Sequence, residues 1–343
     1  CSPIYEYSEL ALNIITIVGM STAFFAASVA LVQTDIKKII AYSTCSQLGY
    51  MFFATGVGAY NVAMFHLFTH AFFKALLFLG SGSVIHAFKD EQNINNMGGV
   101  WKKLPYTYTL MVIGTLALTG FPFLSGFYSK DAIIEFAYLR GNTAGYYAAG
   151  IGIFTAFLTS IYSWRLMFKT FHGNFNNKNI KIEETHESPL VMLIPLIFLS
   201  IGAIFAGFVF KELFIGSYGL NSFWQDSIFF LKPLSTEHPP LWFLISTPTL
   251  VIISIPISYY LFLKNKDLPE QFIKINKPLY QFLLNKWYFD ELYDFIFVKP
   301  SKKLGMFLWK FFDLRIIDGF GPDGISALIK KFSVKANKFQ SGF

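Results

Sequence analysis

Long apolar stretches, separated by short polar ones, make up most of this chain. Seven of them are long enough to cross about 30 Å of hydrocarbon as helices, which takes about 20 residues each. They lie near residues 9–33, 36–57, 60–87, 104–138, 144–168, 188–210 and 239–263. The fourth is interrupted by glycine and proline, so we expect a discontinuous helix there. The pattern predicts an all-α, polytopic membrane helix bundle.

The composition supports this prediction. Of the 343 residues, 54% are hydrophobic and only 14% are charged, and Phe alone occurs 41 times. A water-soluble protein averages about 25% charged residues, so this chain has too few polar side chains to cover a surface in water. Its two cysteines, Cys1 and Cys45, are too few for an iron–sulfur cluster or a four-thiolate zinc site.

The two ends of the sequence resemble the middle of a protein. The chain begins at Cys1 without a methionine, a basic leader or a cleavage site, so no signal peptide is expected. It stops at Phe343 within a basic polar run. We expect truncation at both ends.

Basic residues between the spans orient the bundle, because basic loops stay on the cytoplasmic or matrix side. Nine basic residues are assigned to loops on one side and three to loops on the other. The nine are Lys37, Lys38, Lys89, Lys102, Lys103, Arg165, Lys169, Lys178 and Lys181, and the three are Arg140, Lys211 and Lys232. The side with nine is therefore predicted to face the cytoplasm or matrix.

The segment after residue 263 is basic and amphipathic. It holds 14 of the 28 basic and 8 of the 21 acidic residues, a net charge of +6 out of the total of +7. Apolar residues recur there at helical spacing among lysines, and Gly319 to Gly324 should break the helix before a second basic stretch at 325–339. We expect helices on the membrane surface, held by anionic lipid or by a protein contact.

Three ionisable residues share one face of the third span. His66, His70 and Lys74 are spaced four residues apart, which separates them by about 6 Å each along a helix. A charge at the bilayer centre costs at least about 2.5 kcal/mol, so such residues normally face protein or water. Histidine exchanges protons near neutral pH, and a buried lysine releases its proton more easily than one in water.

Three interpretations of the face formed by His66, His70 and Lys74 are open. Two histidines four residues apart can bind zinc, but no carboxylate lies beside them and Lys74 would repel the ion. The residues can also simply bond to backbone carbonyls or polar neighbours. We favour a proton path.

A second lysine follows the interruption of the fourth span. The sequence TGFPFLSGFYSKD places Lys130 and Asp131 directly after two glycines and a proline. Broken membrane helices mark ion sites in transporters. The alternative is that Lys130 and Asp131 pair as a cap of the second half-helix, close to the membrane interface.

The strings TDIKKIIAYSTCSQLGYMF, FHLFTHAFFKALLFLGSGSVIHA and GFPFLSGFYSKD closely resemble the proton-translocating module shared by the antiporter-like subunits of respiratory complex I and by Mrp-type cation/proton antiporters. The resemblance covers roughly residues 9–173 and implies the second of two inverted five-helix repeats. The later strings NKWYFDELYDFIFVKP and IDGFGPDG resemble the lateral-helix region of the distal complex I subunits. The implied organisation is a repeat at 1–173, a cytoplasmic or matrix loop at 174–187, two further transmembrane helices at 188–263 and a lateral helix at 264–343.

The resemblance also implies roles for individual residues. Lys74 resembles the central proton-carrying lysine of the family, and His66 and His70 resemble the histidines beside it. Lys130 resembles the terminal lysine on the broken helix, with Asp131 as its neighbour. The TDIK element matches at Asp35 and Lys37, with a less defined role. The remaining implied residues, a glutamate and a lysine of the first repeat, have no counterpart in these 343 residues.

The resemblance further implies a proton-translocating membrane-arm subunit of NADH-quinone oxidoreductase. NADH, flavin (FMN), iron–sulfur clusters and quinone would belong to partner subunits, so we expect no cofactor or metal in this chain. The expected partners are neighbouring antiporter-like subunits and lipid, with no nucleic acid, in a bacterial or mitochondrial inner membrane. The alternative function is that of an Mrp-type Na⁺/H⁺ antiporter subunit.

Overall fold

The computed structural model describes residues 2–177, 180–217, 220–231, 238–340 and 342. Within these ranges the chain forms helices and no β-strand, apart from one isolated bridge between Asp35 and Asn93. It divides into two compact units, Cys1–Leu284 and Asn285–Phe343. Cys1, Lys178 and Lys232, which were used in the sequence analysis, lie outside the described residues.

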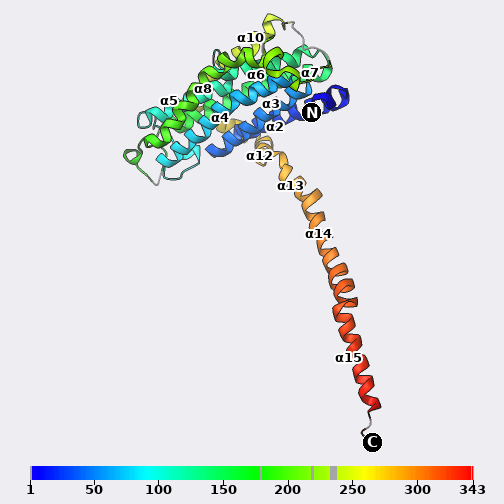
Figure 1. Ribbon diagram of the computed structural model, residues 1–343. Helices are drawn as coiled ribbons and strands as arrows, with labels where there is room; N and C mark the ends of the chain where they lie inside the picture. The colour runs from blue at the N-terminus through cyan, green and yellow to red at the C-terminus, as the bar shows by residue number, and fades with distance from the viewer. Residues whose placement is uncertain (1, 178–179, 218–219, 232–237, 341, 343) are drawn as a thin grey trace. The chain divides into compact units, whose positions relative to one another are not determined.

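The first unit is a bundle of helices that lie side by side (Figure 1). Its longer helices are α2 (Glu9–Val32), α3 (Ile36–Gly56), α4 (Tyr60–Ala87), α5 (Pro105–Thr119), α6 (Ser125–Leu139), α7 (Thr143–Phe171), α8 (Leu190–Ile215) and α10 (Leu241–Tyr259). Its shorter elements are α1 (Ser2–Glu6), η1 (Ile94–Asn96), η2 (Ile182–Glu184), η3 (Leu220–Trp224), η4 (Gln225–Ser227), η5 (Tyr260–Lys264), α11 (Asp267–Ile275) and α12 (Lys277–Leu284). The predicted all-α membrane bundle is confirmed.

Five helices in the described part of the chain are long and apolar enough to cross a membrane. They are α2, α4, α7, α8 and Leu241–Lys264, the last joining α10 and η5. Of the other two predicted spans, α3 has 21 residues but carries several polar side chains, among them Ser43, Ser46 and Gln47. The other is the fourth predicted span, which consists of α5 and α6, each of 15 residues and too short to cross alone.

The interruption between α5 and α6 is confirmed at the expected position. Gly120 ends α5 in the left-handed region, with φ of 82°. A residue with a side chain is strained in that region, which explains the glycine. Helix α6 then begins at Ser125 and contacts α3, α4, α5, α7, α8 and α10. The second half of the broken helix therefore lies at the centre of the bundle.

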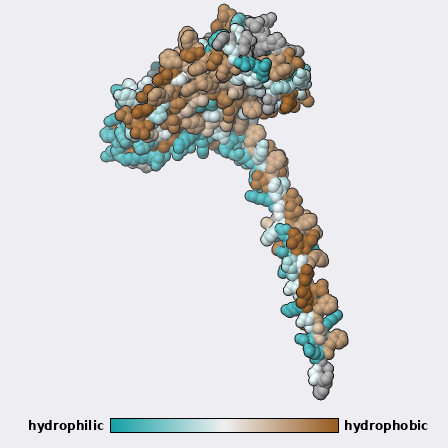
Figure 2. All heavy atoms as spheres, in the orientation of Figure 1, coloured by the Kyte–Doolittle hydropathy of each residue, from teal (hydrophilic) through white to brown (hydrophobic). Residues whose placement is uncertain are grey.

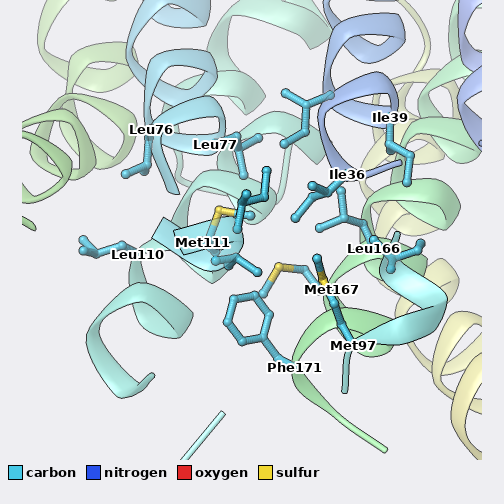
Figure 3. Close-up of a cluster of buried hydrophobic side chains, with 14 of the residues drawn as sticks. Ile36, Ile39, Leu76, Leu77, Met97, Leu110, Met111, Leu166, Met167 and Phe171 are labelled. Atoms are coloured by element: carbon cyan, nitrogen blue, oxygen red, sulfur yellow. The ribbon is translucent and has the colours of Figure 1, made fainter. Parts of the chain in front are cut away.

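Two apolar clusters hold the bundle together. The larger includes Leu76 and Leu77 of α4, Met111 of α5 and Phe171 of α7 (Figure 3). The smaller includes Val62 and Ala63 of α4 and Ile133 of α6. Along α4, His66 and His70 therefore lie between residues of the two clusters. Burial of apolar surface stabilises each end by about 25 cal/mol per Å² and keeps the intervening polar residues away from lipid.

On the face of the bundle seen in Figure 2, hydrophobic side chains cover the helices, and hydrophilic ones gather along one edge. Arg165 and Lys169, which were expected in a loop, instead lie in the C-terminal part of α7. The α7 helix continues to Phe171 because its end is buried among apolar neighbours. Lys211, also expected in a loop, lies in the last turns of α8.

The second unit consists almost entirely of short helical elements that follow one another directly. They are η6 (Lys286–Tyr288), α13 (Phe289–Tyr293), η7 (Asp294–Val298), α14 (Lys299–Leu308), η8 (Trp309–Asp318) and α15 (Pro322–Phe339). The predicted break falls between η8 and α15, and Pro322 stands at the start of the new helix, where its missing N–H is tolerated. Hydrophobic and hydrophilic side chains are mixed along the visible face of this unit (Figure 2).

Candidate proton-transfer site

The ionisable side chains predicted inside the spans are buried in the bundle. Lys130 and His66 are completely inaccessible to solvent, and Lys74, His70 and Asp131 are 4%, 6% and 8% exposed. They come from α4 and α6, which contact each other. Charged side chains are almost never buried to this degree without a partner or a function.

His66 joins three helices. Its Nε2 lies 3.0 Å from Oε1 of Gln47 on α3, and its Nδ1 lies 2.9 Å from Oγ of Ser129 on α6. In the neutral imidazole one ring nitrogen donates and the other accepts. With the Gln47 amide in this orientation, Nε2–H donates to the amide oxygen and Nδ1 accepts from the serine hydroxyl.

Ser129 extends the network further. Its Oγ lies 2.7 Å from Oγ1 of Thr69 and 3.2 Å from the carbonyl oxygen of Ser125, in addition to its contact with His66. A hydroxyl has one proton to donate and rotates freely between acceptors. Ser129 can therefore donate to any one of three acceptors, and it immediately precedes Lys130 in the chain.

His70 lies between His66 and Lys74 on α4. Its ring centroid is 5.9 Å from that of His66, and its Nε2 is buried without a hydrogen-bond partner among the described residues. The Lys74 ammonium, one turn further on, donates to the carbonyl oxygen of Ile40 on α3 at 3.3 Å. The three residues thus form a continuous polar face that is closed to the outside.

Lys130 is held by the end of the preceding half-helix. Its ammonium donates to the carbonyl oxygen of Thr119 at 2.6 Å and lies 3.5 Å from that of Leu118. These carbonyls belong to the last turn of α5, where no amide is available to them and the helix dipole is negative. The break between α5 and α6 therefore creates the cation site.

Asp131 does not form an ion pair with Lys130, since no such pair within 4.0 Å occurs in the described part of the chain. Both of its carboxylate oxygens are buried without a hydrogen bond there. The alternative of a Lys130–Asp131 cap at the membrane interface does not describe this geometry. Lys130 bonds to α5 instead, deep in the bundle.

Asp35 and Lys37 lie outside this buried group. Asp35 is the N-cap of α3 and accepts a hydrogen bond from the backbone N–H of Lys38 at 3.0 Å. Lys37 is exposed in the first turn. The structure thus gives Asp35 a local role in starting α3, and it does not bring either residue to the histidines and lysines.

Sequence reasoning missed two hydroxyls and did not single out one amide of this group. Ser129 and Thr69 were not considered, and Gln47 was treated only as part of a polar face. Thr69 follows His66 by three residues and therefore shares its helical face, which was a usable signal. Ser129 pairs with a residue 63 positions away, and that contact had no local signal.

The comparisons with known proteins agree with this architecture. Residues 1–159 match the family described as NADH:quinone oxidoreductase/Mrp antiporter, TM. The whole chain is 45% identical to NADH-ubiquinone oxidoreductase chain 5 of Phytophthora infestans and 45% identical to NADH-quinone oxidoreductase subunit L of Rickettsia bellii, covering 52% and 53% of those proteins. Among solved structures, the Mrp complex from Dietzia sp. matches with a TM-score of 0.58 and 23% identity, over 77% of this chain and 30% of that chain, which shows a shared fold.

The fold and the buried ionisable group define an antiporter-like membrane subunit. The chain belongs to the family that includes NADH-quinone oxidoreductase subunit L and NADH-ubiquinone oxidoreductase chain 5. It spans about half the length of the curated relatives it matches. The predicted localisation, an integral membrane protein of a bacterial or mitochondrial inner membrane, is confirmed by this family and by the apolar helices.

Proposed function

We propose that this chain is part of a proton-translocating subunit in the membrane arm of an NADH:quinone oxidoreductase. The observation that carries the proposal is the buried line of exchangeable groups from Lys74 through His70, His66 and Ser129 to Lys130. Relatives matched over the whole chain are named as subunits of that oxidoreductase. NADH, FMN, iron–sulfur clusters and quinone are assigned to partner subunits.

The proposed path begins at Lys74. When Lys74 releases its proton, His70 is the next exchangeable group on the same face, and His66 follows it. This transfer uses the other tautomer of His66, reached when the Gln47 amide turns over. A proton taken up at Nε2 is then matched by release of the Nδ1 proton to Ser129. Rotation of the Ser129 hydroxyl then resets the hydrogen bond, so the proton passes from α4 to α6.

The driving force in this proposal is electrostatic. A charge held in the bilayer interior costs several kcal/mol, so the charged state of Lys74 responds strongly to any charge moved nearby. Lys130 is better compensated, because it bonds to two carbonyls of the α5 terminus and Lys74 to one. The proton is therefore held more favourably on Lys130 than on Lys74. Quinone reduction in the partner subunits supplies the change in electrostatic potential that drives the transfer.

The rival function is Na⁺/H⁺ antiport in an Mrp-type assembly without a redox partner. The Mrp likeness in structure supports the fold alone. The relatives named as oxidoreductase subunits match the whole chain, including the segment after residue 263. We therefore favour the oxidoreductase subunit.

The test is proton pumping by the complex that contains the full-length subunit. Lys74→Ala should lower the protons moved per NADH oxidised in inverted vesicles, while NADH:ferricyanide activity and assembly on a blue-native gel are retained. Lys103→Ala, an exposed change in the loop before α5, is the matched control. Unchanged stoichiometry in Lys74→Ala would refute the role. Recovery of the chain only in a band without NADH dehydrogenase activity, together with Na⁺-dependent proton release, would favour the antiporter instead.

A further inference from the structure

A cavity unrelated to the buried lysines and histidines opens at the loop end of the first unit. Its volume is about 190 Å³, more than ten times the space that one water needs. The end of α7, the loop at 172–176, η5 and the start of α11 surround it. It lies on the side predicted to face the cytoplasm or matrix.

The polar wall of the cavity is basic. Lys169 and Lys266 line it, and the one carboxylate in its lining is that of Glu270. Arg165 lies near enough to Lys169 to interact with it electrostatically. Neither lining lysine forms an ion pair within the described residues, and Lys169 donates only to Oδ1 of Asn95, at 2.7 Å. With two lysines and one carboxylate in its described lining, the cavity carries a net positive charge and unused donors.

Much of the remaining lining is apolar, and is called here the apolar wall. It is formed by Phe168 of α7, by Leu261, Phe262 and Leu263 of η5 and by Ile273 of α11. Just before these residues, Tyr259 and Tyr260 are 46% and 50% exposed. Tyrosines at the end of a membrane helix mark the boundary between hydrocarbon and water. The cavity thus joins a cationic wall to an apolar wall at the level of lipid headgroups.

We propose that this cavity binds the phosphate headgroup of an anionic phospholipid. Lys169 and Lys266 bind the phosphate, the amides of Asn95 and Asn176 supply further donors, and the apolar wall accepts the start of the acyl chains. A free phosphate matches the lysines equally well but leaves the apolar wall uncovered. The two walls together favour the lipid.

The experiment uses the purified, delipidated complex with its full-length subunit. Phosphatidylglycerol in detergent is titrated, and bound lipid is counted by native mass spectrometry. The double variant Lys169→Gln/Lys266→Gln should bind phosphatidylglycerol at least tenfold more weakly than the wild type. The control Lys274→Gln/Lys277→Gln removes the same charge from helices α11 and α12, at residues that do not line the cavity, and should bind as the wild type does.

A third variant guards against loss of binding through misfolding. Glu270→Gln removes the only carboxylate of the lining and should tighten phosphatidylglycerol binding severalfold. Phosphatidylcholine should bind weakly to all four proteins. Equal binding by the lysine variant and its control would overturn the proposal. Competition by millimolar inorganic phosphate without any preference for the lipid would identify free phosphate as the ligand, and would also overturn it.

Discussion

At the residue scale, Ser129 connects the two helices that carry the buried charges. One hydroxyl has three acceptors within reach, namely Nδ1 of His66, Oγ1 of Thr69 and the carbonyl of Ser125. Ser129→Ala should lower the protons pumped per NADH oxidised by two- to tenfold. The substitution leaves His66 Nδ1 without its partner, a loss of about 1–3 kcal/mol for a buried polar group. Fluorescence quenching in inverted vesicles, normalised to NADH oxidation, measures this.

Ser81→Ala is the matched control for that substitution. Ser81 is also a buried serine, but among the described residues its side chain bonds only to the carbonyl of Phe78 on its own helix. Its loss should leave pumping unchanged. If Ser129→Ala pumps as well as Ser81→Ala, the proton does not pass through Ser129.

The ionisable residues of the site were predictable, but most of their partners were not. A lysine inside an apolar stretch stands out because the bilayer penalises its charge, so Lys74 and Lys130 were identified without a structure. The carbonyls that accept their hydrogen bonds, at Ile40 and Thr119, belong to other helices. Every residue has a backbone carbonyl, so nothing in the sequence marks these two as the acceptors. Whether the predicted residues carry protons stays a prediction that the pumping assays test.

At the scale of elements, the first turn of α5 depends on a residue from a distant loop. Leu104 at the N-cap has no capping side chain, and Glu187 instead accepts from the backbone N–H groups of Tyr106 and Thr107, at 2.9 and 3.2 Å. Losing a cap costs about 1 kcal/mol. Glu187→Ala should therefore speed hydrogen exchange at these two amides by about fivefold. Glu183→Ala, an exposed change in the same loop, should have no effect there, and equal rates in both variants would contradict the capping role.

The carboxylate of Glu91 stabilises the loop between α4 and α5 through hydrogen bonds, an arrangement called here the clamp. Burial acts to raise the pKa of Glu91, but hydrogen bonds from the backbone N–H of Asn93, the side chain of Asn96 and the backbone N–H of Gln92 outweigh it and lower the pKa below its ordinary value. A lowered pKa in the folded state means that the ionised carboxylate stabilises the loop above about pH 4.3, the ordinary value for glutamate. The stabilisation is lost as the pH falls below that value, through the pKa of the folded state.

Hydrogen exchange of residues 92–96 in the intact complex tests the clamp. After correction for intrinsic rates, protection should be constant near neutral pH and should fall as the solution is acidified below about pH 4.3. Glu91→Gln should be less protected at neutral pH and should show no such fall. A wild-type loop with pH-independent protection would contradict the clamp.

The elements themselves were largely predictable, because hydrophobic length and helix breakers act locally. The break was predicted from two glycines and a proline, and Gly120 indeed ends α5 in the left-handed region, which glycine adopts without strain. Helix ends were predicted less well. Arg165 was placed in a loop by its charge, yet its guanidinium donates to the carbonyl of Leu31 at the end of α2, at 2.8 Å. A contact with the end of another helix stabilises the buried cation, and the sequence of α7 contains no sign of it.

At the scale of the whole molecule, most of the net charge lies in the segment after residue 263, and most of the long apolar stretches lie before it. Residues up to 263 carry a net charge of +1 and the remainder +6. Composition alone therefore predicted both a membrane bundle and a basic surface segment. It did not predict how helices pack, since α6 reaches the centre of the bundle only through contacts with six other helices in the described part of the chain.

The last helix, α15, has the properties of a segment that lies on a membrane surface. Ile325, Leu328, Ile329 and Phe332 form an apolar face at helical spacing and are 56–66% exposed within their unit. Four lysines, at 330, 331, 335 and 338, accompany one acid, Asp323. Most of the stability of a helix comes from packing of its apolar face and little from helix propensity, so α15 needs a surface to fold against.

A peptide of residues 320–340 should therefore be mostly unfolded in buffer and become helical with phosphatidylglycerol vesicles, as measured by circular dichroism. Each lysine near an anionic surface contributes about 1 kcal/mol, so replacing all four by glutamine should weaken binding by more than a hundredfold. Salt should weaken the native peptide's binding and affect the glutamine variant little. Helix formation on neutral phosphatidylcholine vesicles to the same extent would show that apolar contact alone holds α15. Absence of binding to either vesicle would assign its apolar face to a protein surface, because an uncovered face of this kind does not persist in water.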